Sequence, residues 1–150
     1  MPLTTAQQSA LETLAGRPLT AAEVSLASAR SDAALAQSLS AGRTAPGILP
    51  VSLFAAWCSK TGVRATIEDA SVNPASPLRS GALTIKDLLS RDTSSLDLSM
   101  SAMGRGNVVM LEAWVTAGAI TPAQRDSLIA LAAMPAPIDC NTVSNILSGV

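Results

Sequence analysis

The chain has 150 residues, with ten Lys and Arg against eleven Asp and Glu, a formal net charge of −1, and no histidine. It lacks the basic excess with which nucleic-acid-binding proteins neutralise phosphates, so we expect no direct binding to DNA or RNA. Charged residues make up only 14% of the chain, and a surface with so little charge favours association with other proteins.

Start and stop signals divide the chain into short helical segments. Three capping boxes predict helix starts, namely Thr5 with Gln8, Thr20 with Glu23, and Thr121 with Gln124. Glycine and proline turns predict the stops. The predicted helices cover about 5–15, 20–40 with a break near Ser31 and Asp32, 51–61, 63–70, 77–90, 107–117, 121–133 and 140–148.

These segments predict an all-α fold, an irregular bundle of about seven or eight short helices joined by Gly/Pro turns. We expect residues 1–150 to form a single helical domain, since this length is typical of one. The segment 135–150, which begins at Pro135, is a candidate docking element at the C-terminal end.

The connection at about 92–107 departs from the helical pattern. Leu96, Leu98 and Met100 alternate with polar residues, which is the period of a strand rather than of a helix. Two interpretations follow: an irregular loop laid over the core, or an arm that contacts a neighbouring chain by strand addition. On the second interpretation these three residues are candidate interaction residues.

The residue types give no catalytic arrangement. Without histidine, the commonest general base is absent and a serine or cysteine nucleophile would lack its usual partner. Cys58 and Cys140 lie too far apart in sequence for a zinc motif and are typical of small buried apolar residues. We therefore predict no enzymatic activity, no catalytic residue, no cofactor and no metal.

Targeting and membrane signals are also missing from the pattern. The N-terminal stretch has no basic region followed by an apolar run, and no segment approaches the ~18 apolar residues of a membrane span. We expect no membrane insertion and synthesis in a cytoplasm.

Four further residues are candidates for contacts. Trp57 and Trp114 are large side chains in an alanine-rich sequence, so each is first a predicted core residue and, if exposed, an interface residue. Arg43 and Arg79 stand beside helix ends, where an arginine caps carbonyl groups, remains solvated or contacts a partner.

Three segments resemble small, poorly characterised proteins encoded among the structural genes of tailed bacteriophages. The segments are DAALAQSLSAGRT (32–44), TGVRATIEDASVNPASPLRSGALTIKDLL (61–89) and MLEAWVTAGAITPAQRDSLIALA (110–132). They cover over half the chain, in the order found in those proteins. The resemblance brings no catalytic residues and implies a role in the virion or in its assembly.

We therefore expect a virion structural or assembly protein of a tailed phage, made in the host cytoplasm and located in the head, neck, tail or baseplate. Its expected partners are other phage structural proteins and further copies of itself. Two alternatives remain open at the level of sequence. One is a phage protein outside the virion that binds and inhibits a host protein, and the other is a transient assembly chaperone.

Overall fold

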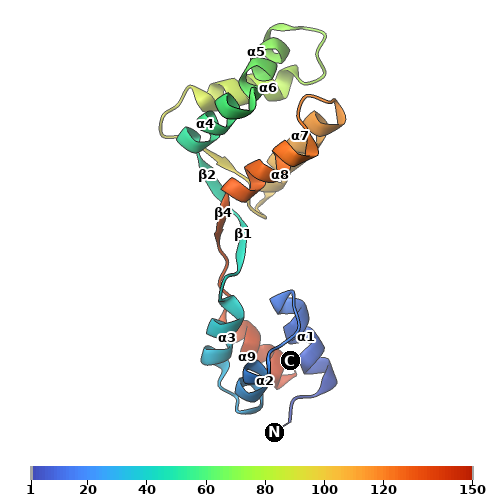
Figure 1. Cartoon of the computed structure of the whole chain (residues 1–150), viewed down its shortest axis with the longest axis vertical. Coiled ribbons are helices and arrows are strands. Elements are labelled where there is room, and N and C mark those ends of the chain that lie inside the picture. The colour runs from blue at the N-terminus through green and yellow to red at the C-terminus, as the bar shows by residue number, and fades with distance from the viewer. Residues whose placement is uncertain (1, 150) are drawn as a thin grey trace. The chain divides into compact units, whose positions relative to one another are not determined.

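The computed structural model describes residues 2–149, and within them the chain is all-α, as predicted (Figure 1). The helices are α1 (Thr5–Ala15), α2 (Ala21–Ser28), α3 (Asp32–Ser40), α4 (Val51–Thr61), α5 (Val63–Val72), α6 (Arg79–Leu89), α7 (Ala102–Thr116), α8 (Pro122–Leu131) and α9 (Cys140–Ser148). Four three-residue strands complete the structure: β1 (Thr44–Pro46), β2 (Ile48–Pro50), β3 (Ser95–Asp97) and β4 (Ala133–Pro135).

The chain is arranged as two compact units, whereas the sequence was interpreted as one domain. Unit 1 combines Met1–Thr44 with Pro135–Val150, and unit 2 is Ala45–Met134. The chain passes from unit 1 to unit 2 within β1 and back within β4, and these two strands pair with each other. Unit 2 is therefore an insertion between α3 and α9.

Unit 1 is built from α1, α2, α3 and α9, and Figure 1 shows α9 in red among the blue N-terminal helices. Val143 and Leu147 of α9 are buried in one cluster with Leu11, Leu35 and Leu39. The segment 135–150, predicted as a candidate docking element, thus supplies part of the unit's own core. Its apolar positions 143 and 147 are one helical turn apart and face inward.

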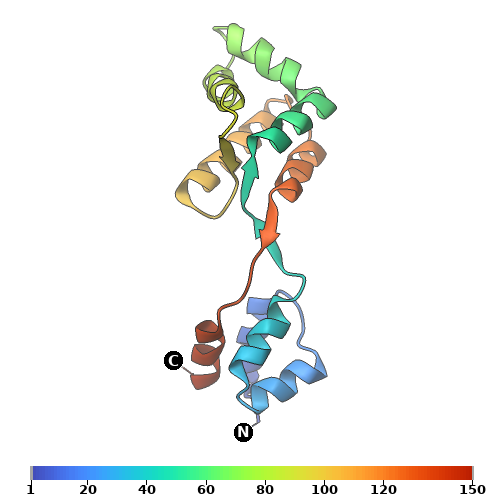
Figure 2. The same ribbon diagram turned by 90° about the vertical axis from the view of Figure 1, so that its left-hand side faces the viewer.

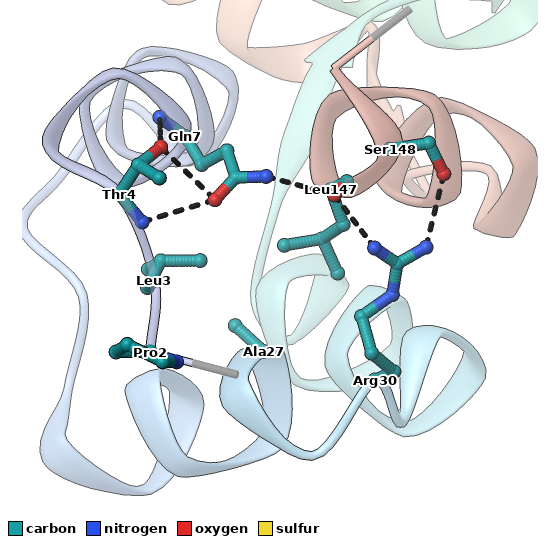
Figure 3. A pocket seen from close by; sticks show the side chains of 8 residues that line it. All are labelled: Pro2, Leu3, Thr4, Gln7, Ala27, Arg30, Leu147 and Ser148. Carbon is teal, nitrogen blue, oxygen red and sulfur yellow. Dashed lines mark hydrogen bonds between the residues drawn. The ribbon is translucent and has the colours of Figure 1, made fainter.

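Gln7 of α1 and Arg30 of the turn between α2 and α3 bind the end of α9 (Figure 3). Arg30 donates through Nη1 to the Leu147 carbonyl at 2.6 Å and through Nη2 to the Ser148 hydroxyl at 2.9 Å, and Gln7 donates to the same carbonyl at 2.8 Å. Carbonyl groups at a helix end lack partners within the helix, so these bonds cap α9. Arg30 adopts a positive φ of 58°, which an L-residue does only at a cost in energy.

Glu23 is the one charged side chain buried in unit 1 among the described residues, at 1% exposure. Arg17 donates to both of its carboxylate oxygens, at 2.7 and 2.8 Å, while Thr20 and Ser38 donate to it at 2.8 to 3.0 Å. The same carboxylate closes the predicted capping box at the start of α2. These bonds, first among them those from Arg17, hold the pKa of Glu23 well below its usual range.

This lowered pKa predicts that unit 1 loses stability in acid. A carboxyl whose pKa is lower in the folded state contributes fully above its unfolded value, near 4.3, and the contribution is lost as the pH falls toward the folded value. We expect Glu23→Gln to cost about 1–3 kcal/mol at pH 7 and to flatten the dependence on pH below about 5. Urea unfolding followed by circular dichroism at pH 7 and pH 3.5 measures both effects.

The matched control for this pH dependence is Glu12→Gln, which removes a less buried carboxylate of the same unit. It should leave the loss of stability between the two pH values close to that of the natural chain. A Glu23→Gln variant with an unchanged pH dependence would contradict the assignment of this acid sensitivity to Glu23.

The core of unit 2 is formed by α4 to α8 and β3. Phe54 and Trp57 stack with ring centroids 6.2 Å apart, and Trp114 is 2% exposed in the same cluster. Both tryptophans are thus core residues, which is the first of the two roles predicted for them.

The two cysteines are unpaired in this structure. Cys58 is buried in the core of unit 2, and burial raises the pKa of its thiol to about 11. Cys140 is half-buried, and neither cysteine forms a disulfide.

The connection at 92–107 is shorter and more ordered than predicted. β3 pairs antiparallel with β2 of the same chain, with Leu96 opposite Leu49, and both Leu96 and Leu98 are buried in the unit 2 core. The period-two pattern was correct, but the partner strand lies within the chain rather than in a neighbour. The partner strand β2 is three residues long and contains Pro50, so it gives almost no pattern in the sequence.

Two helix starts also differ from the prediction. α7 begins at Ala102 rather than near Asn107, because the Ser101 hydroxyl accepts from the Gly104 N–H at 3.0 Å and caps the helix. The first capping box uses Thr4 with Gln7, one residue earlier than predicted. The repeat TTAQQ satisfies both registers, and the observed one lets the preceding Leu3 pack against the unit 1 core.

Candidate interaction surface

Within residues 2–149 no group of three or more Cys, Asp and Glu side chains is placed to hold a metal ion. No helix in this part of the chain is long and apolar enough to cross a membrane.

An apolar hollow of unit 2 lies between α4 and α8. Its walls are two helical stripes, and its volume is about 520 Å³. The stripe on α4 repeats at three and four residues, the spacing that brings side chains to one helix face. The lining residues are Leu53, Ala56, Trp57, Lys60 and Thr61 of α4 and Ser127, Ala130 and Leu131 of α8.

The groove is lined by small side chains and by two large, exposed leucines. Ala56, Ala130 and Ser127 occupy little space, whereas Leu53 and Leu131 are 50% and 48% exposed. Two exposed leucines around small residues form a surface typical of helix and side-chain docking sites.

Hydrogen bonds between α4 and α8 fix the groove. The Trp57 Nε1–H donates to the Ser127 hydroxyl at 2.9 Å, and the Gln124 amide donates to the Thr61 carbonyl at 3.4 Å. The groove is consequently formed before any partner arrives, which reduces the entropy cost of binding.

One cation borders the groove. Lys60 is exposed in the last turn of α4 and has no ion pair within the described chain. An apolar groove with a single cation at its border favours a partner that brings apolar side chains and one carboxylate.

A second apolar feature is the segment 98–103, which comprises the end of the loop before α7 and the first two residues of that helix and which we call the methionine loop. Met100 is 73% exposed and Met103 is 70% exposed. Asp97 organises the loop, because its carboxylate accepts from the Ser99 N–H and the Ser101 hydroxyl, both at 2.8 Å. These bonds, first those to Ser99, lower the pKa of Asp97.

Gly104 locks the methionine loop against α7. A Cβ at this position would lie closer to the Ser99 backbone than van der Waals contact allows, whereas a Cβ at Gly106 would meet open space. We expect Gly104→Ala to destabilise unit 2 by about 1–3 kcal/mol and Gly106→Ala to stabilise it by up to about 1 kcal/mol, since alanine favours a helix interior. Thermal unfolding followed by tryptophan fluorescence compares the two, and equal effects would contradict the tight packing.

The exposed apolar residues are unevenly distributed. All nine large apolar side chains that are exposed among residues 2–149 belong to unit 2. They are Ile48, Leu53, Val72, Leu83, Met100, Met103, Val109, Leu131 and Met134. Unit 2 also contains seven Lys and Arg and seven Asp and Glu, so it carries no net charge to oppose association.

The two predicted arginines cap helices. Arg43 donates to the Leu14 carbonyl at 2.6 Å, at the end of α1, and Arg79 donates to the Ser71 carbonyl at 3.4 Å, at the end of α5. Both contacts match the capping interpretation of these arginines. They lie in different units and form no common site.

Of the other predicted interaction residues, Met100 alone is exposed. Leu96, Leu98 and Trp114 are buried, and Trp57 is 6% exposed at the floor of the groove. The sequence reasoning missed Leu53, Lys60 and Leu131. An available signal was that α4 is apolar on more than one side. Phe54 and Cys58 are buried in the core, whereas Leu53 and Ala56, on another side of the helix, are exposed.

Unit 1 has its own hollow, of about 360 Å³, lined by Pro2, Leu3, Thr4, Gln7, Ala27, Arg30, Leu147 and Ser148 (Figure 3). The polar groups in it are already engaged: Gln7 and Arg30 donate to α9, and Thr4 and Gln7 close the cap of α1. This hollow is therefore best explained as the junction of three helix ends.

Comparison with protein-family models, with curated proteins and with solved structures finds no match to this chain.

Proposed function

We propose that this chain is a structural or assembly protein of a tailed bacteriophage particle, and that it acts by binding other proteins through unit 2. The three sequence segments that resemble phage structural-cluster proteins support the phage origin. All nine exposed large apolar side chains lie in unit 2, and this concentration is what most favours a protein-binding role.

The α4/α8 groove is the contact we assign to this function. It combines exposed leucines, a floor of small residues and one unpaired cation, and its two helices are held together by hydrogen bonds. Buried apolar anchors in such a preformed site supply most of the binding energy of an interface.

Quantitative mass spectrometry of purified particles tests the function. A reproducible copy number relative to the major capsid protein is expected for a virion component. Absence from clean particles, with presence in the infected cell, would contradict virion incorporation and favour a transient chaperone or an inhibitor of a host protein.

A substitution in the groove tests the surface. Leu131→Lys should prevent incorporation into particles, because a desolvated ammonium group in the interface is strongly unfavourable. Leu83→Lys on α6 is the matched control: Leu83 is 47% exposed against 48% for Leu131, but it does not line the groove. Equal incorporation of both variants would show that the α4/α8 groove is not the contact.

A further inference from the structure

The groove is an apolar hollow with a cation at its border, and the methionine loop presents exposed apolar side chains next to a carboxylate. We propose that the methionine loop of one copy of this chain docks into the α4/α8 groove of a second copy. This inference rests on the proposed function, and it names a partner for the same groove, namely another unit 2.

The loop can fill the groove because it presents long apolar side chains, whereas part of the groove is lined by small ones. The groove is apolar and floored by Ala56 and Ala130, whereas the loop presents two methionines that are among the most exposed apolar side chains of unit 2. Methionine is unbranched and polarizable, so it fills irregular apolar space and packs well against aromatic rings such as that of Trp57.

The loop is already ordered before docking. Asp97 holds Ser99 and Ser101, and the Asn107 amide donates to the Asp97 carbonyl at 2.8 Å. The close approach of Gly104 to Ser99 fixes the loop against α7. Association then orders little more than the methionine side chains, which reduces its entropy cost.

The charges also match. Lys60 borders the groove without an ion pair, and Asp97 supports the loop without an ion pair within residues 2–149. A carboxylate accepts more hydrogen bonds than the two described here, so Asp97 can receive Lys60. Arg105, on the first turn of α7, is also exposed and has no ion pair among residues 2–149, so only an orientation that turns Asp97 toward Lys60 avoids repulsion.

The two surfaces belong to different sides of unit 2. In Figure 2 the amber loop and the start of α7 lie on the left of this unit, while α8, in orange-red, lies on its right. An interface that joins two different surfaces leaves a free loop at one end and a free groove at the other. Copies joined in this way extend into a ring or a filament rather than close as a symmetric dimer.

Disulfide trapping between two variants, each with one added exposed cysteine, tests the contact. Met100→Cys and Leu131→Cys are each made in the full chain with Cys140→Ser, so that Cys58, which is buried, is the only other thiol. After mild oxidation the mixture should give a cross-linked dimer that contains one of each variant, while each variant alone should not form it. Leu83→Cys, mixed with Met100→Cys, is the control for random collisions at equal exposure.

Lys60→Glu in the groove-bearing partner should reduce the cross-linked product by about tenfold or more, since like charges across an interface cost at least 1.4 kcal/mol. No product above the Leu83→Cys control would overturn the inference, as would efficient cross-linking of Leu131→Cys with itself. Incorporation into particles without this cross-link would overturn only the loop-to-groove contact. The cross-link in a chain absent from particles would overturn only the virion role.

Discussion

Replacing Leu98 with aspartate is expected to unfold unit 2. Leu98 is 2% exposed in the core cluster that also contains Trp57 and Trp114. The variant loses the packing of a buried leucine, which is worth about 2–5 kcal/mol, and places a carboxylate in an apolar core cluster. The sum is comparable to the whole stability of a small domain.

The measurement can separate the two units. Phe54 and both tryptophans lie in unit 2, and the chain has no tyrosine, so tryptophan fluorescence reports unit 2 alone while far-ultraviolet circular dichroism reports helices of both. We expect Leu98→Asp to abolish the cooperative fluorescence transition and to leave part of the helical signal. Met100→Asp, two residues away but 73% exposed, should unfold like the natural chain. A folded Leu98→Asp variant would restore the arm interpretation of this segment.

Removing α9 is expected to unfold unit 1. A chain that ends at Pro137 lacks Val143 and Leu147 and exposes Leu11, Leu35 and Leu39 of the same cluster. It also leaves Arg30 in its left-handed conformation without the α9 groups that it caps. The three remaining helices, of eight to eleven residues, are too short to be stable without tertiary packing.

The expected signature is the reverse of that for Leu98→Asp. Helical circular dichroism should fall by the contribution of unit 1, and the remaining transition should coincide with the fluorescence transition of unit 2, which persists. Two point substitutions serve as a graded control: Val143→Ala, at a fully buried position, should cost about 2 kcal/mol, and Asn145→Ala, on the exposed side of α9, should cost little. Persistence of all the helical signal of unit 1 in the shortened chain would identify 135–150 as a docking segment after all.

The helices were predictable because their boundaries are local. Thr20 with Glu23 and Thr121 with Gln124 are bonded as their spacing predicts, since a capping box depends only on residues within one turn. The exceptions were α1, whose capping box lies one residue earlier than predicted, and α7, where Gly104 and Gly106 disfavour a helix in isolation. The start of α7 depends on the Ser101 cap and on the close approach of Gly104 to Ser99, but in the sequence a glycine predicts a break rather than a helix start.

The division into units and the groove were not predictable, because both depend on contacts distant in sequence. α9 packs on α1 and α3, although all of unit 2 separates it from them in the sequence. Nothing within Cys140–Ser148 specifies these partners. Likewise, Leu53 and Leu131 form one groove only because Trp57 reaches Ser127 across α4 and α8. The low charge of the sequence favours association with other proteins but gives no position for a contact surface.

The insertion of unit 2 between α3 and α9 sets the order in which the chain can fold on the ribosome. Unit 2 is continuous in sequence, so it can complete its core as soon as Met134 has emerged, and domains generally fold as units during synthesis. Unit 1 must wait, with α1 to α3 already made, until α9 is translated. A translation product that stops within the last turns of α9 would therefore carry a finished unit 2 and an open unit 1, whose exposed leucines would mark it for chaperones or proteases.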